Sequence, residues 1–233
     1  MGLARSVIDA FPSYTIRFEG RVYTMYSDVE GLITTGMGNL IDPLTAALAL
    51  KWRHADGGLA GSDQIASDWQ RIKALAMPGG KLDPAFVKHS TEVQAKIAGL
   101  TLHLTSEDVD SPVLERLNSG ALDMQRRHFP ALESYPADAQ LALCSMMWAA
   151  GSDWPRKFPR AKQAILARDW ATAAKEAVLA DHTPSGVANP GVIPRNDQQR
   201  ICFANAAAVE AGGLDASVLY WPAFPHEPEA ADA

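Results

Sequence analysis

The chain has 233 residues, 47% of them hydrophobic and 21% charged, which is enough apolar material for a sizeable core and an ordinary charge content for a globular protein. Its formal net charge of −6 argues against a nucleic-acid-binding protein, which usually presents a basic face. Two cysteines, Cys144 and Cys202, are too few for a disulfide-rich secreted scaffold. Both lie in apolar helical patterns, so we expect buried reduced thiols, with a single disulfide as the alternative.

A helix followed by a small hairpin is predicted at the start of the chain. Residues 6–18 are apolar on one face but contain Pro12, which predicts a short helix, a break, and a second helical stretch that reaches Glu19. Gly20 follows directly, and glycine tolerates the left-handed conformation that often ends a helix. Residues 22–26 are β-branched and aromatic, as in strands, and a turn over residues 27–31 precedes a return strand over residues 32–35.

The segment Gly36-Met37-Gly38 interrupts the return strand. It indicates a bulge, or a backbone that another group approaches closely. We expect the end of the first helix to face the hairpin across a gap wide enough for a sugar chain.

The rest of the chain is predicted to be mainly helical. The most apolar helix, over residues 137–150, is expected to form the core, and an acidic loop over 106–112 precedes one of the other helices. The full set of predicted helices covers 43–55, 62–77, part of 83–101, 112–127, 137–150, 159–168, 169–180 and 194–211, with Asp169 as a cap.

These elements predict an α+β fold, mostly helical with a small antiparallel sheet. We expect one domain over residues 1–225, a single folding unit with two lobes, followed by a loose tail over 226–233. Within it, residues 18–42 form the helix end and hairpin, 43–136 a series of helices, and 137–213 the core and closing helices. The loop over 182–194 is expected to line a cleft.

Glu19, Asp28 and Thr34 are the candidate catalytic residues. Each has an ordinary structural role as an alternative, so the inference rests on their combination. Two carboxylates in different settings and a hydroxyl are what hydrolysis of a glycosidic bond requires, because one carboxyl donates a proton and the other holds a water nucleophile. Glu30 is interpreted as a structural residue of the turn.

The Glu19-Gly20 pair, the Asp-x-Glu-Gly that begins at Asp28 and the Thr-x-Gly-x-Gly that begins at Thr34 resemble the catalytic hairpin of the phage-type lysozymes, glycoside hydrolase family twenty-four. Two further segments agree in order: residues 140–151 are similar to the buried central helix of that family, and residues 191–203 to the start of its C-terminal helix. The span between Asp42 and Gln140 is longer than usual, which implies extra helices.

The resemblance implies a lysozyme-like fold and a role for each matching residue. Glu19 would be the general acid, and Asp28 and Thr34 would position the attacking water. Tyr26, Leu40, Asn39 and Arg195 would contact the sugar chain, with ordinary packing as the alternative for Tyr26 and Leu40. The sequence departs from the family pattern at Asn39, Ala149 and Gln199, where the family often has His, Asn and Glu. These positions concern substrate contacts and local ion pairs, and none of them is one of the three catalytic positions.

The expected activity is that of a muramidase, which hydrolyses the β-1,4 bond between N-acetylmuramic acid and N-acetylglucosamine in peptidoglycan, with inversion. No cofactor is implied, and the six histidines show no metal-ligand spacing. The expected partner is the peptidoglycan glycan strand, with an immunity or inhibitor protein as a further partner. Neither nucleic acid nor membrane insertion is expected, and we expect a monomer.

The expected location follows from the first residues. They lack the apolar run of a signal peptide, and Asp9 interrupts them, so we expect a protein made in the cytoplasm that acts on the cell wall after release by a holin or delivery by a secretion machine. Its acidity is unusual for an enzyme of an anionic polymer. Arg126-Arg127 and Arg156-Lys157 are candidates for a basic cleft, although solvated helix ends are the favoured interpretation.

Two rival functions remain at this point. One is a non-catalytic peptidoglycan-binding module with the same fold. The other is a peptidoglycan peptidase that uses Cys144 with His182. The position of Cys144 in the middle of the most apolar helix favours an inert core thiol over a nucleophile.

Overall fold

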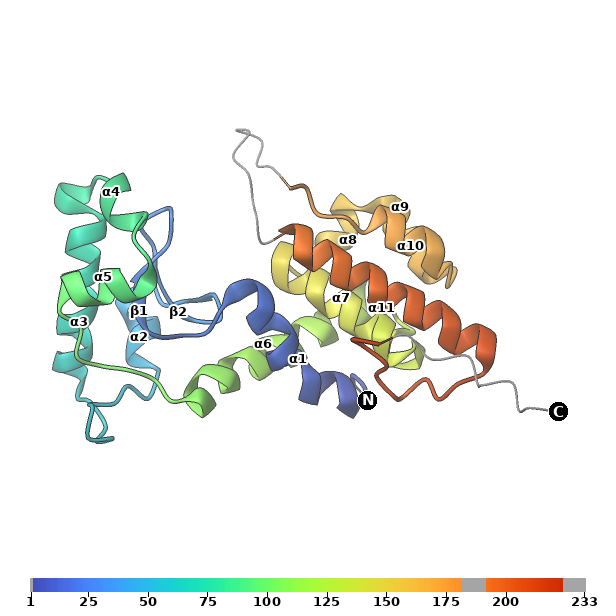
Figure 1. The fold of residues 1–233 in the computed structure, drawn as a ribbon, viewed down its shortest axis with the longest axis horizontal. Helices are drawn as coiled ribbons and strands as arrows, with labels where there is room; N and C mark the ends of the chain where they lie inside the picture. The colour runs from blue at the N-terminus through green and yellow to red at the C-terminus, as the bar shows by residue number, and fades with distance from the viewer. Residues whose placement is uncertain (1, 182–191, 224–233) are drawn as a thin grey trace. The chain divides into compact units, whose positions relative to one another are not determined.

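The computed structural model describes residues 2–181 and 192–223. The fold is mostly helical with one small antiparallel sheet, as the α+β prediction required (Figure 1). Contacts divide the chain into two compact units, residues 19–113 and residues 1–18 with 114–233. Each unit is described by itself below. The predicted loop over 182–194 falls mostly, and the predicted tail entirely, outside the described residues.

The sheet of the first unit has three strands in the order β1-β2-β3, one more than the sequence predicted. β1 spans Val22–Ser27, β2 spans Ile33–Gly36 and β3 spans Asn39–Leu40. The third strand exists because the chain reverses at Gly36 and Gly38, which have φ values of +64° and +75°. The fully buried Met37 side chain anchors this reversal, so the predicted bulge at residues 36–38 is a turn.

The helices of this unit are α2 (Leu44–Leu48), α3 (Ser62–Ala76), the 3-10 turn η1 (Pro78–Gly80), α4 (Pro84–Val87) and α5 (Thr91–Ala98). α3 and α5 both pack against β1. The prediction for 62–77 is confirmed, whereas the helix predicted over 43–55 ends at Leu48. The chain leaves the helical path there because Trp52 is buried and the backbone of Arg53 forms bridges to Leu59 and His103.

Two helices are longer than predicted because proline does not interrupt them. α1 spans Arg5–Glu19 without a break and contains Pro12. A proline inside a helix costs about 3 kcal/mol. Buried side chains on both sides of it, including Val7 and Phe11 before and Tyr14 after, keep one face of the helix packed and offset this cost.

α6 spans Ser106–Arg127 and includes Pro112, so the predicted acidic loop over 106–112 is helical. The helix begins early because Thr105 and Asp108 cap it reciprocally. The amide of Asp108 donates to the Thr105 hydroxyl at 3.1 Å, and that hydroxyl donates to the Asp108 carboxylate at 2.6 Å.

The second unit is built around α7 (Ala137–Ala150), whose residues 137–148 are all buried, as predicted for a core helix. α7 lies beside α11 (Val192–Gly212) in Figure 1. The short helices α8 (Trp154–Lys157), α9 (Pro159–Leu166) and α10 (Trp170–Glu176) and the turn η2 (Leu132–Ser134) complete the unit. The carboxylate of Asp169 accepts the Thr172 amide, so the predicted cap is confirmed.

Cys144 and Cys202 are both buried and free, in agreement with the expectation of reduced thiols. Within residues 2–181 and 192–223, no helix combines the length and the apolar character needed to cross a membrane.

A buried carboxylate joins the C-terminal segment to this core. Asp138 is fully buried near the start of α7 and accepts backbone amides from Tyr220 and Trp221, each at 2.9 Å. The Asn205 side-chain amide of α11 donates to the same carboxylate at 2.8 Å. Burial raises the pKa of Asp138, because it disfavours the charged carboxylate. The three hydrogen bonds compensate for the loss of hydration of this buried group.

Replacement of Asp138 by alanine is expected to lower the free energy of unfolding by about 3 kcal/mol, because two buried donors and one partly buried donor lose their acceptor. Urea unfolding followed by circular dichroism measures the change. Asp197→Ala, which removes an exposed carboxylate paired with Arg200, is the control and should cost less than about 1 kcal/mol. Equal losses in the two variants would contradict the role assigned to Asp138.

Candidate active site

Three of the predicted site residues form a row across the sheet. Tyr26 of β1 is the register partner of Thr34 of β2, and Thr34 is in turn the partner of Leu40 of β3. Side chains of directly opposed residues lie on the same face of a sheet. Thr34 is 6% exposed and Leu40 is 50% exposed, so the row runs from a buried hydroxyl to an accessible apolar side chain.

Asn39 has a different place. Its register partner is Thr35, which neighbours Thr34 in β2. Because successive side chains of a strand point to opposite faces, Asn39 and Thr35 belong to the face opposite the row. The Thr35 hydroxyl donates to the carbonyl of Thr24 at 2.9 Å, which is a structural contact within the sheet.

Asp28 follows β1 and is oriented by its own turn. Its Oδ1 accepts the backbone amides of Glu30 and Leu32, both at 2.9 Å. The Asp28 amide donates to the Leu32 carbonyl and the Gly31 amide to the Asp28 carbonyl, which closes the turn. In the part of the chain that the structure describes, Oδ2 makes no hydrogen bond to protein, so this oxygen is available to a water molecule.

Glu19 is the last residue of α1, and Gly20 follows it with a φ of +68°, as the helix-end prediction required. Its carboxylate lies against the reversal between β2 and β3, since a Cβ atom at Gly38 would stand 3.4 Å from Glu19 Oε2. The close approach predicted for the segment 36–38 is therefore observed, and the approaching group is the Glu19 carboxylate.

The pKa of Tyr26 responds to the charges of both Glu19 and Asp28. Its pKa is raised to about 12, first by burial and then by the negative charges of Glu19 and Asp28. Tyr26 faces Thr34 across β1 and β2, and the negative charges of Glu19 and Asp28 both act on its phenol. The Tyr26 hydroxyl keeps its proton at neutral pH and can donate a hydrogen bond there.

Arg195 belongs to the second unit, in the first turns of α11. It is 4% exposed, and its guanidinium lies 4.6 Å from the centre of the Phe18 ring and 3.4 Å from the Ser145 hydroxyl. Ser145 also receives hydrogen bonds from Gln199 and Tyr14. These contacts give Arg195 a packing role between α7 and α11.

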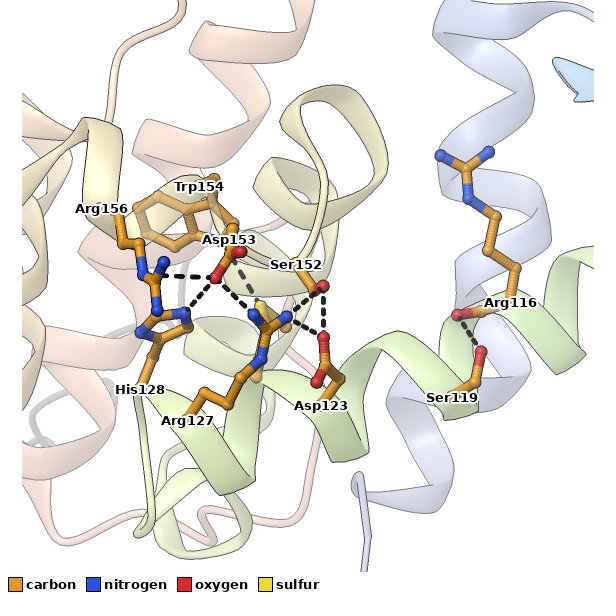
Figure 2. Close-up of polar contacts among 10 residues, drawn as sticks. Arg116, Ser119, Asp123, Arg127, His128, Ser152, Asp153, Trp154 and Arg156 are labelled. Atoms are coloured by element: carbon orange, nitrogen blue, oxygen red, sulfur yellow. Dashed lines mark hydrogen bonds and ion pairs between the residues drawn. The ribbon is translucent and has the colours of Figure 1, made fainter.

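The basic residues proposed for a cleft are partly neutralised. Figure 2 shows Arg127, His128 and Arg156 gathered around Asp153, with nitrogen–oxygen distances of 2.6, 3.0 and 3.6 Å. Arg127 also pairs with Asp123. Arg127 and Arg156 thus belong to a mixed-charge cluster, which fits the favoured interpretation of solvated helix ends.

The burial of Cys144 bears on the peptidase alternative. Cys144 is fully buried, and burial raises the pKa of its thiol, which disfavours the nucleophilic thiolate. His182 lies outside the described residues. Across residues 2–181 and 192–223, no group of three or more His, Cys, Asp or Glu residues could hold a metal ion.

Comparison with known proteins adds no assignment, since neither a protein-family model nor a curated protein matches the chain.

The placement of both carboxylates near Tyr26 can be tested without any assay of activity. Glu19→Gln and Asp28→Asn should each lower the pKa of Tyr26 from about 12 toward 10, because removal of a nearby negative charge favours the phenolate. Absorbance at alkaline pH, measured after rapid mixing and assigned by subtraction of Tyr26→Phe, follows this titration. Glu30→Gln is the control and should leave it unchanged; a Tyr26 pKa insensitive to both test variants would refute the placement.

Proposed function

We propose that this chain is a muramidase that hydrolyses the β-1,4 bond between N-acetylmuramic acid and N-acetylglucosamine in peptidoglycan. Its main support is geometric: the Glu19 carboxylate lies against the β2–β3 reversal, Asp28 is oriented by its turn, and Thr34 stands in the row with Tyr26. The negative charges of both carboxylates act on the Tyr26 phenol. This is the set of groups that the resemblance to the phage-type lysozymes requires, carried by a helix end and a small sheet.

The proposed mechanism uses the two carboxyl groups differently. Glu19, protonated, donates its proton to the leaving glycosidic oxygen. Asp28 stays ionised and uses Oδ2, with the Thr34 hydroxyl, to hold a water molecule and to accept its proton. The water attacks the anomeric carbon from the opposite face, so the product has inverted configuration.

The contacts of Asp28 and the exposed side chain of Leu40 support these roles. The Asp28 Oδ1 atom accepts two backbone amides, which orient the carboxylate and leave Oδ2 to hold the water molecule. The partly exposed Leu40 offers an apolar surface at the end of the row on which a sugar ring can pack. Arg195, in contrast, has contacts that suit packing better than substrate binding.

We further propose that the protein acts on the cell wall as a phage endolysin or an injected antibacterial effector, for which an immunity or inhibitor protein would be the natural antagonist. A non-catalytic glycan-binding module is the second candidate. It would bind sacculi without releasing reducing ends.

Glu19→Gln is expected to lower the rate of reducing-end release from purified sacculi by ~10²–10⁴, the usual effect of losing a general acid. Mass spectrometry of the wild-type digest should show reducing N-acetylmuramic acid ends. Anhydro ends would indicate a transglycosylase, and binding without cleavage would indicate the non-catalytic module.

Two further variants sharpen this test. Asp28→Asn should reduce the rate comparably, because the water loses its base. Glu30→Gln, in the same turn, should retain the wild-type rate. Full activity of Glu19→Gln would falsify the catalytic assignment.

The burial of Cys144 predicts an inert thiol, in contrast to the peptidase alternative. Native protein should react with a thiol-specific reagent only as fast as it unfolds, because both cysteines are buried and burial raises the pKa of the Cys144 thiol. Cys144→Ala should leave glycan cleavage within about twofold of wild type, since packing but not chemistry changes. Release of stem peptides that stops on alkylation would instead support the peptidase.

A further inference from the structure

The turn that carries Asp28 is held on its first side by a glutamine from α5. The Oε1 atom of Gln94 accepts the Ser27 amide at 2.7 Å, and its Nε2 atom donates to the Ser27 carbonyl at 3.1 Å. Gln94 is only 2% exposed, and Nε2 also donates to the His89 carbonyl at 3.2 Å. The amide thus occupies both backbone groups of the residue that precedes Asp28.

A lysine from α3 holds the other side of the same turn. Lys73 Nζ donates to the Gly31 carbonyl at 2.9 Å and pairs with Asp42 Oδ2 at 2.5 Å. The same carboxylate oxygen accepts the Ile33 amide at 3.2 Å. The Lys73 and Asp42 side chains are 27% and 14% exposed, so the pair is partly shielded from solvent.

Side-chain packing also restricts the turn between the hydrogen bonds of Gln94 and those of Lys73. Gly31 has a φ of +79°, and a Cβ atom there would stand 2.5 Å from Met77 Sδ and 2.9 Å from Leu82 Cδ1. The turn is therefore seated against the end of α3 and the segment that follows it. Its position depends on these helices as well as on its own hydrogen bonds.

We propose that Lys73 and Gln94 are positioning residues for Asp28. They fix the backbone before and after the turn whose amides, those of Glu30 and Leu32, orient Asp28 Oδ1. The helices over 62–98, which the sequence suggested only as extra material, thereby support the candidate site. That Lys73 and Gln94 hold the turn is a structural claim that does not depend on the activity. That they affect catalysis through Asp28 rests on the proposed function.

Amide hydrogen exchange, measured by NMR on the full chain, tests the structural part. In Lys73→Met and in Gln94→Met, near-isosteric changes, the Glu30 and Leu32 amides should exchange about 3- to 10-fold faster than in wild type, as expected for loss of a net hydrogen bond. Amides of α7 should exchange as before. Unchanged exchange at Glu30 and Leu32 in both variants would overturn the inference.

Arg53→Met is the matched control. Arg53 also pairs with an aspartate, Asp108, and donates to a backbone carbonyl, that of Gly57; the two paired side chains are 30% and 11% exposed. It lies in the same unit but makes no bond to the turn. Equal acceleration of the Glu30 and Leu32 amides by Arg53→Met would reveal a general loss of stability and would count against the proposal.

Steady-state kinetics on soluble glycan fragments tests the catalytic part. Lys73→Met and Gln94→Met should lower kcat about 10- to 100-fold, with KM within about twofold, because a displaced base weakens the transition state more than substrate binding. Lys73→Arg, which keeps the charge and the donors, should recover most of kcat. Asp42→Asn weakens the Lys73–Asp42 ion pair and replaces Lys73→Met in this test if that variant does not fold.

The outcomes separate the two proposals. If activity depends on Glu19 but kcat is unchanged in Lys73→Met and Gln94→Met, the positioning inference fails and the muramidase proposal stands. If the wild-type protein cleaves no glycan, the muramidase proposal fails, and amide exchange still decides whether the two side chains hold the turn.

Discussion

The candidate site depends on two hydrogen bonds, those from the backbone amides of Glu30 and Leu32 to Asp28 Oδ1. Both donors belong to the turn that carries the carboxylate, so the direction of this side chain is set by backbone conformation. These bonds leave Oδ2 for other contacts. Anything that moves the turn therefore moves the proposed base.

The electrostatic setting of the site is acidic, in keeping with the net charge of −6. Burial and then the negative charges of Glu19 and Asp28 raise the pKa of the Tyr26 phenol to about 12, so this hydroxyl stays protonated at neutral pH. Arg127 and Arg156 of the second unit are paired with the carboxylate of Asp153. For the proposed activity, this acidity would oppose long-range attraction of an anionic wall polymer, so binding would rely on contacts at the sheet face.

Local patterns predicted much of the secondary structure. The core helix over 137–150 and the helix from Ser62 were predicted nearly to the residue, because apolar periodicity and flanking Gly or Pro residues are local signals. The same signals failed at Pro12 and Pro112, where proline predicted an interruption. Packing of a helix face and a reciprocal cap outweighed that preference.

The sequence by itself determined the candidate chemistry: a carboxylate at a helix end, another in a turn, a hydroxyl on a strand, and glycines where φ must be positive. These follow from bonding within a few residues. Only the tertiary structure decided which side chains share a face, as with Leu40 and not Asn39, and which distant groups, Lys73 and Gln94, hold the turn of Asp28. Register and helix packing join residues far apart in the chain, and no local pattern encodes those partners.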